Sequence, residues 1–167
     1  MFKGTYRYRI DAKGRLPVPA PFRRALRSGG GERVVATLVD QCIALFPLPE
    51  WARLEAQLRA LPPFSRSAKA LSRHLASRAV DGELDAQGRL LLAPALREAT
   101  GLHREAVVVG VLDRIEIWSP PAWERFLKDS EQLLEDVGLE VAWPLPSPAG
   151  PPGPHSATEL PQAKPNR

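Results

Sequence analysis

The chain has 167 residues, of which 44% are hydrophobic, and this is enough to build one compact domain or two small intertwined ones. Its single cysteine, Cys42, excludes an intramolecular disulfide, and no apolar run reaches the about eighteen residues of a membrane span. The net charge is +4, yet residues 1–33 alone hold nine Lys and Arg against two acidic residues, and such a basic end is typical of proteins that bind a polyanion.

The first predicted element is a strand near the N-terminus in which large and basic side chains alternate. Tyr6 and Tyr8 fall on one face, together with Ile10, and the intervening basic residues fall on the other. This period of two predicts a half-buried strand with a cationic face. The basic residues of this segment are candidates for contacts that position a nucleic-acid backbone without reading its sequence: Lys3, Arg7 and Arg9.

The strand leads into a short turn of the pattern Asp-x-x-Gly-Arg, from Asp11 to Arg15. Asp is favoured at the first position of a type I turn because its carboxylate accepts from backbone N–H groups two residues on. Gly14 then supplies the positive φ of a three-residue hairpin loop. We expect a rigid β-hairpin tip that presents Arg15. The alternative is a solvated turn with an ordinary surface ion pair, which would be worth little.

Five further elements are predicted up to residue 80. A short helix opens with Pro21, two β-rich runs meet at Asp40-Gln41, and a helix begins near Pro49 with Trp51 on its apolar side. Cys42 lies in the second apolar run and is expected to be a small buried core residue. After a Pro-Pro break, an amphipathic helix is predicted over residues 65–80.

The same plan then recurs. Asp85 to Arg89 repeats the turn motif 74 residues later, with Gly88 in the turn-forming place of Gly14. Phe22-Arg23 is answered by Leu96-Arg97 at the same offset, and Trp51 by Trp123 at an offset of 72. Two copies at matched positions favour a functional role for the turn over the alternative of a solvated turn with an ordinary surface ion pair. The chain is interpreted as a tandem duplication.

The duplication divides the chain into four parts. The expected second-copy elements are a hairpin over residues 84–92, a short helix over 94–99, strands over 107–112 and 114–118, and a final helix to about residue 136. The last 24 residues contain eight prolines and almost no large apolar groups, so they are expected to be disordered. The predicted parts are a first module (1–61), a helical connector (62–80), a second module (81–143) and a disordered Pro-rich tail (144–167).

Enzymatic chemistry is not indicated. The three histidines, His74, His103 and His155, have no metal-ligand spacing, and Cys42 has no partner nearby in the sequence. No nucleophile elbow, P-loop or Gly-rich dinucleotide turn is present. Asp11 and Asp85 are already committed to their turns. We therefore expect no catalytic residue, metal, cofactor or small-molecule substrate.

These residues together resemble the MraZ family, within the wider SpoVT/AbrB-like group of swapped-hairpin DNA-binding domains. The resemblance covers residues 1 to about 143, and it is carried by Met1-Phe2-x-Gly4, the two Asp-x-x-Gly-Arg turns, Phe22-Arg23, Glu50-Trp51, and the run from Val109-Gly110 through Ile117-Trp118 to Trp123-Glu124. It implies an α+β fold, mainly β with short helices. Two AbrB-like swapped-hairpin modules would form one intertwined, pseudo-symmetric β-barrel. One departure is Ala93, which stands where the first copy has Pro19.

The resemblance also implies a function. MraZ-like chains are sequence-specific transcriptional regulators, expected here to repress the division and cell-wall gene cluster that includes their own gene. They form ring-shaped homo-oligomers that bind G-containing direct repeats in double-stranded DNA, and they are cytoplasmic and nucleoid-associated rather than membrane-bound. By match to the family motif, the DNA-contacting pairs would be Asp11 with Arg15 and Asp85 with Arg89.

The chemistry of the motif agrees with that expectation. A two-stranded ribbon fits the major groove, where Arg15 and Arg89 could each bind guanine O6 and N7. Lys13 and Gln87 occupy the same place in the two tips; Lys13 suits a phosphate, whereas Gln87 could read adenine. One alternative stays open, in which an oligomeric interaction protein uses its basic hairpins to bind RNA or an acidic protein.

Overall fold

The computed structural model describes the main chain of residues 1–140, with the side chains of residues 1–131 and 133. The chain divides into two units, Met1–Asp129 and a second that begins at Ser130, and all the strands and turns described below belong to the first. The predicted Pro-rich tail, 144–167, lies outside the described residues.

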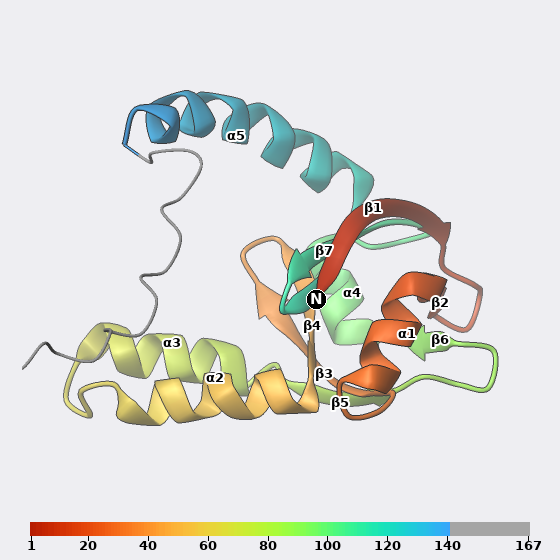
Figure 1. Cartoon of the computed structure of the whole chain (residues 1–167), viewed down its shortest axis with the longest axis horizontal. Coiled ribbons are helices and arrows are strands. Elements are labelled where there is room, and N and C mark those ends of the chain that lie inside the picture. The colour runs from red at the N-terminus through yellow and green to blue at the C-terminus, as the bar shows by residue number, and fades with distance from the viewer. Residues whose placement is uncertain (141–167) are drawn as a thin grey trace, which may run out of the picture. The chain divides into compact units, whose positions relative to one another are not determined.

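The elements follow the order that the duplication predicts (Figure 1). The first half contains β1 (Phe2–Arg9), β2 (Arg15–Pro17), α1 (Ala20–Ser28), β3 (Arg33–Val39), β4 (Cys42–Pro47) and α2 (Leu48–Ala60). After α3 (Arg66–Ala76), the second half contains β5 (Val80–Glu83), β6 (Arg89–Leu91), α4 (Pro94–Thr100), β7 (Glu105–Leu112), β8 (Arg114–Trp118) and α5 (Pro120–Glu140).

Strands of the two halves pair with one another rather than only among themselves. The larger sheet has six antiparallel strands in the order β1-β7-β8-β4-β3-β5, and a second sheet contains β2 and β6. In Figure 1, β1 from the start of the chain lies alongside β7 from the second half. Exchanging each strand with its counterpart in the other half leaves both sheet orders unchanged. The halves are therefore intertwined about a pseudo-twofold axis.

Aromatic contacts follow the same pseudo-symmetry. Phe46 at the end of β4 contacts Trp51 of α2, with ring centroids 5.9 Å apart. Trp118 at the end of β8 contacts Trp123 of α5, with centroids 5.7 Å apart. The tandem repetition of the tryptophan helices predicted from the sequence is confirmed by this equivalence.

The core is shared by both halves. Leu16 of β2 and Leu90 of β6 are fully buried, at 0% and 1% exposed, and they lie directly opposite each other in the small sheet. Phe22 of α1 packs edge-on against Phe2 and Tyr6 of β1, with ring centroids 5.6 and 5.3 Å away. Neither half could bury Leu16 or Leu90 in this way alone, because the strand opposite each of them comes from the other half.

Several local predictions are confirmed. The alternation in β1 places Tyr6 and Tyr8 against the core, whereas Arg7 and Arg9 are exposed. Cys42 is buried, as predicted, and burial raises the pKa of its thiol far above the ordinary value. Ala93 keeps the main-chain conformation of its counterpart Pro19, with φ of −56° against −51° before the following helix.

The predicted fold class is right in its coarse form only. The fold is mixed α+β and duplicated, but it is not mainly β, because the helices contain more of the described residues than the strands do. Among the strands of residues 1–140 the ladders do not close into a barrel, since β1 and β5 are the two ends of the six-stranded sheet. The helix predicted over residues 65–80 ends early, at Ala76, because Val80 pairs with Ala36 and starts β5.

Candidate nucleic-acid interface

The first tip, defined as Asp11–Arg15, is held by one carboxylate. Asp11 Oδ1 accepts hydrogen bonds from the main-chain N–H groups of Lys13 at 2.9 Å and Arg15 at 3.0 Å. Asp11 Oδ2 accepts from Nε of the Arg15 side chain at 2.7 Å. The Gly14 N–H donates to the Asp11 carbonyl at 2.9 Å, and Gly14 has the positive φ, 84°, that a side chain would strain. The turn and its arginine are thus fixed as one unit.

The second tip, Asp85–Arg89, repeats this geometry. Asp85 Oδ1 accepts from the N–H groups of Gln87 at 3.0 Å and Arg89 at 2.9 Å, and Oδ2 accepts from Arg89 Nε at 2.9 Å. Gly88 has a φ of 74°. One difference concerns the end of the arginine. Arg89 Nη2 also donates to the Gln87 side-chain oxygen, whereas no partner for the Nη groups of Arg15 is found among the described residues.

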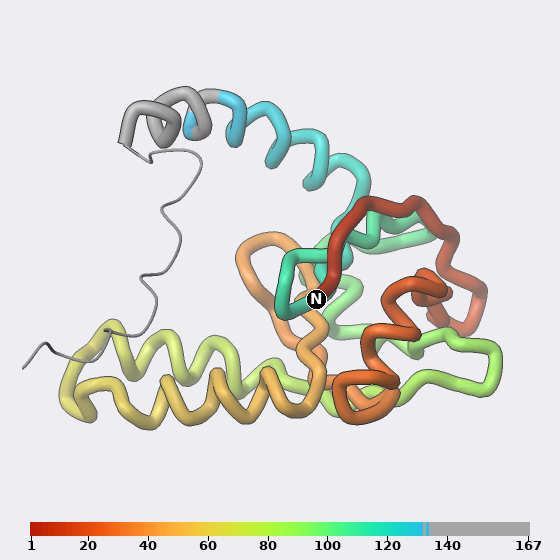
Figure 2. Tube along the Cα trace, in the orientation of Figure 1, coloured from red at the N-terminus to blue at the C-terminus, as the bar shows by residue number. Residues whose placement is uncertain are grey.

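The fold brings the two tips side by side. β2 and β6 pair antiparallel, and the glycine carbonyl of each tip accepts one further hydrogen bond from the residue just beyond the opposite strand: the Val18 N–H donates to the Gly88 carbonyl and the Leu92 N–H to the Gly14 carbonyl, both at 3.0 Å. Arg89 Nη1 lies 3.8 Å from Asp11 Oδ2. Figure 2 shows the two turns on the same side of the domain. Two arginines from sequence-distant turns are therefore presented together.

One expectation about the tips is wrong. The residues predicted a hairpin at each turn, the second over residues 84–92, but β1 pairs with β7 and β2 pairs with β6. Around the second turn the two sides are linked by the bridge between Leu84 and Leu90 and by the hydrogen bond from the Asp85 N–H to the Arg89 carbonyl. The exchange is favoured because it buries Leu16 and Leu90 between the halves.

Both tip carboxyls have a pKa below the ordinary value. For Asp11 the main cause is the hydrogen bond from the Arg15 main chain, supported by the Arg15 side chain. For Asp85 the side-chain hydrogen bond from Arg89 is the largest cause, followed by the Arg89 main chain. Each carboxylate therefore stays ionised, and each turn stays locked, well below neutral pH.

Two arginines that the sequence did not single out as site residues cover the tips. Arg97 of α4 lies over Gly14, since a Cβ built there would be 3.2 Å from its guanidinium carbon, and Arg23 of α1 lies over Gly88 in the same way. The Nε atoms of both are buried without a partner in the described part of the chain. The signal that could have found them is the repeat itself, because Arg23 and Arg97 are 74 residues apart, like Arg15 and Arg89.

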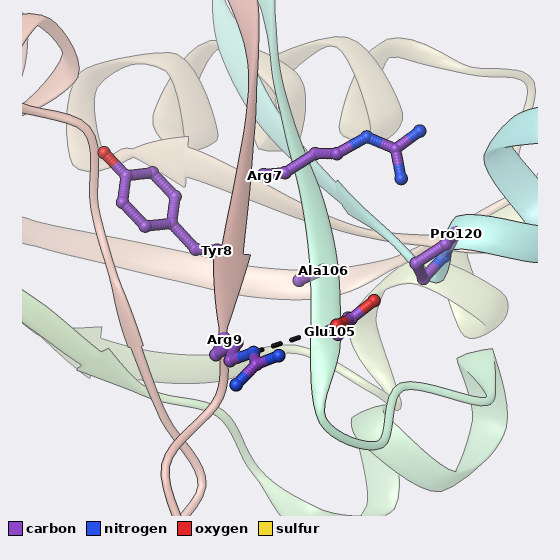
Figure 3. Close-up of a pocket in the computed structure, with 6 residues that line it drawn as sticks. All are labelled: Arg7, Tyr8, Arg9, Glu105, Ala106 and Pro120. Carbon is purple, nitrogen blue, oxygen red and sulfur yellow. Dashed lines mark ion pairs between the residues drawn. The ribbon is translucent and has the colours of Figure 1, made fainter.

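The remaining site residues lie on β1 and at the outer corners of the tips. Figure 3 shows Arg7 and Arg9 on the opposite side of the strand from Tyr8, with Arg9 directed toward Glu105 of β7. That ion pair is loose, 3.8 Å, and well exposed. Lys3 and Lys13 are exposed as well. The structure thus places a basic strand edge next to the first tip.

Other kinds of site receive no support within the described ranges. No group of three His, Cys, Asp or Glu side chains in residues 1–131 is arranged to hold a metal ion. None of the helices described is both long and apolar enough to cross a lipid bilayer.

Comparison with known proteins identifies the class to which this geometry belongs. The family described as "MraZ protein, putative antitoxin-like" matches residues 1–74 and again residues 75–137. The proteins named "Transcriptional regulator MraZ" from Lactobacillus delbrueckii subsp. bulgaricus and Natranaerobius thermophilus are 39% and 40% identical over 141 and 142 residues, which is 84% of this chain and 96% of each relative. The one from Desulfitobacterium hafniense is 48% identical over 132 residues, 78% of this chain and 90% of its own.

The chain belongs to the MraZ family, with two tandem MraZ domains. The resemblance inferred from the doubled turn motif is confirmed. The relatives in this comparison carry the name of transcriptional regulators.

Proposed function

We propose that the protein is a sequence-specific DNA-binding transcriptional regulator that reads guanines with the arginines of its two tips. The observation that carries this proposal is the pair of carboxylate-clamped arginines, Arg15 and Arg89, which strand exchange brings together. Clamping reduces the conformational entropy that an arginine side chain loses on binding.

Duplex DNA suits these tips for a steric and a chemical reason. The major groove is wide enough for a two-stranded β structure, and an arginine there can donate two parallel hydrogen bonds to guanine O6 and N7. With Arg15 Nε held by Asp11, the two Nη groups are directed outward to make that contact. Asp11 and Asp85 would also repel a phosphate that approached the arginines, and this favours bases over backbone.

The flanking residues have the chemistry of positioning contacts. Lys3, Arg7 and Arg9 are exposed along β1, and Lys13 is exposed at the first tip. We assign them to the phosphate backbone, where they add affinity without sequence preference. Gln87 is the exception, because its amide could read an adenine, although in the free protein its oxygen accepts from Arg89 at 3.1 Å.

The wider role follows from the family. We infer that the protein represses the division and cell-wall gene cluster containing its own gene, by binding G-containing direct repeats on the nucleoid in the cytoplasm. Each half would be an AbrB-like swapped-hairpin module, spanning 1–61 and 81–143, with 62–80 as the connector. Several chains would assemble into a ring that offers tips to successive repeats. The relatives' shared name, transcriptional regulator, supports the first part of this inference.

The test is a salt titration of binding to the duplex upstream of the protein's own gene cluster, against a scrambled duplex of equal length. We expect tight binding to the native duplex alone, weakening steeply as salt rises, because each neutralised phosphate contributes a slope of about 0.9 in log K against log salt. Equal binding to both duplexes would contradict sequence-specific reading. Binding to neither would leave RNA or an acidic protein as the partner.

A further inference from the structure

A basic groove lies beside the first tip. It has a volume of about 610 Å³, and its charged or ionisable lining comes from three stretches of the chain: Arg9, Asp11, Arg97, His103, Arg104 and Glu105. Only Arg9 of its cations was expected to bind nucleic acid. Arg97 reaches the groove from α4, and His103 and Arg104 reach it from the loop before β7.

The groove is fixed to the tip by the main chain. The Ile10 N–H, one residue before Asp11, donates to the Arg104 carbonyl at 2.8 Å. Arg97 covers Gly14 in the same turn. Arg104 is thus attached to the element that presents Arg15, and a ligand in the groove would have a defined position relative to a base that Arg15 contacts.

The electrostatics of the groove favour an anion. Its three arginines face two carboxylates, and both carboxylates already have partners: Asp11 is held by Arg15 at 2.7 Å, and Glu105 lies 3.8 Å from Arg9. Arg104 is exposed, and no side-chain partner for it is found among the described residues. The Arg97 Nε is buried without an acceptor in that same part of the chain. An exposed, uncommitted guanidinium in a groove is the arrangement that binds phosphate.

The equivalent place beside the second tip keeps an arginine, Arg23, in the place of Arg97, but it differs in charge at its other neighbours. The bond from Ile10 to Arg104 corresponds to a bond from the Leu84 N–H to the carbonyl of Glu32, so Arg104 is replaced by an acidic residue. The pair Arg9 with Glu105 in β1 and β7 corresponds to Glu83 with Arg33 in β5 and β3, so that pair is reversed. Glu32 is itself bound to Arg27 at 2.6 Å. The duplication has kept the tips and reversed these neighbours.

We propose that this groove is a backbone-phosphate site of the DNA-bound protein, with Arg104, Arg97 and Arg9 as its ligands, and that its counterpart at Glu32 and Glu83 binds no phosphate. The proposal rests on the DNA-binding function proposed above and adds a direction to it. A module with a phosphate site at one tip only is not two-fold symmetric toward DNA. It binds each repeat in one orientation, as head-to-tail repeats require.

The experiment compares Arg104→Ala with Arg24→Ala on the full chain. Both variants remove one exposed arginine, but Arg24 lies on α1 and does not line the groove. On the native upstream duplex at about 50 mM salt we expect Arg104→Ala to weaken binding about tenfold, and to lower the salt slope by about 0.9. The scrambled duplex should lose affinity by the same factor, because a phosphate contact has no sequence preference. Arg24→Ala should change neither quantity by as much.

Ethylation interference on the native duplex tests whether the protein binds each repeat in one orientation. Wild type should be blocked by ethylated phosphates on one side of each repeat, and this interference should disappear with Arg104→Ala. Interference on both sides of each repeat, or equal losses of affinity for Arg104→Ala and Arg24→Ala, would overturn the groove as a one-sided phosphate site. The proposed function would still stand in that case, provided that wild type bound the native duplex specifically. Failure of wild type to prefer the native duplex would overturn both.

Discussion

Asp11 and Asp85 combine two tasks in a single carboxylate. One oxygen accepts the main-chain N–H groups that shape the turn, and the other orients the arginine that the turn presents. The two arginines are not equal, however. Arg89 donates to Asp85 and Gln87 and lies near Asp11, whereas the Nη groups of Arg15 have no partner in the described part of the chain. Arg15 can bind a base without first breaking an existing contact.

This difference makes Arg15→Lys the sharper test of base reading. A lysine keeps the charge but cannot make the two parallel bonds to guanine, so we expect discrimination against a substituted guanine to fall by about 10- to 100-fold. Arg89→Lys should have a smaller effect on discrimination. The measurement is the ratio of Kd values for native and guanine-substituted duplexes in a gel shift. As a control, Lys3→Ala should weaken both duplexes alike. If Lys3→Ala lowered discrimination as much as Arg15→Lys, the assignment of roles would be wrong.

The lowered pKa values of the tip carboxyls give a pH dependence with a definite sign. Each Asp binds protons less readily in the folded state than in the unfolded state, where the pKa is about 3.9. Their contribution to stability is therefore fully present above about pH 5 and is lost as the pH falls through the folded-state values. We expect the urea concentration at the unfolding midpoint to decrease when the pH is lowered below 4, partly for this reason.

The Asp11→Asn variant isolates that contribution. Asparagine resembles the protonated carboxyl, so the difference in urea midpoint between wild type and variant should be largest at pH 7 and shrink at pH 3. A difference that stayed constant between these two pH values would show that ionisation of Asp11 does not stabilise the turn.

At the residue scale, the sequence predicted what is local and missed what the fold assembles. The turn motif follows from Asp, Gly and Arg at fixed spacing, and it was found without a structure. Arg97 and Arg104 were not recognised, because each comes to the first tip from the other half of the chain. No linear pattern states that a helix of one copy covers the turn of the other.

At the element scale, the β2–β6 pair holds the two tips together. Each strand has only three residues, and Pro17 offers no N–H, so hydrogen bonds alone would hold the pair weakly. The buried side chains Leu16 and Leu90 supply what the ladder lacks. Turn chemistry specifies only the reversal of the chain, whereas the burial of Leu16 and Leu90 decides which strands pair. This is why the strands on either side of each turn do not pair as the predicted hairpin.

Truncating a buried and an exposed leucine within this strand pair should show whether the effect on stability depends on burial of the side chain or only on its position in the pair. Leu16→Ala removes a side chain that is 0% exposed and should lower the free energy of unfolding by about 2–5 kcal/mol. Leu91→Ala is a matched control in the facing strand, since Leu91 is 63% exposed, and should change it by no more than about 0.5 kcal/mol. Urea denaturation measures both. Equal losses would mean that the pair is held by its backbone ladder rather than by its core side chains.

At the scale of the whole molecule, duplication of one module provides two tips per chain but few base contacts per tip. The pseudo-twofold pairing of strands places both tips on one side of the domain (Figure 2). Each arginine contributes only about 1–3 kcal/mol of discrimination, so one domain on one repeat has little to bind with. Under the proposed function, tight binding would therefore come from several domains on several repeats.

An oligomer that presents several domains gains affinity through effective concentration, by about 10²- to 10⁴-fold when its spacing matches the repeats. Gel shifts with one, two and three repeats should thus show affinity rising steeply with repeat number. A duplex with three repeats whose spacing is lengthened by about 5 base pairs, half a helical turn, is the control, because it turns the middle repeat to the opposite face of the DNA. The gain should be lost on that duplex. If one repeat bound as tightly as three, or if altered spacing made no difference, each domain would bind DNA independently, and the assembly would have to serve something other than operator affinity.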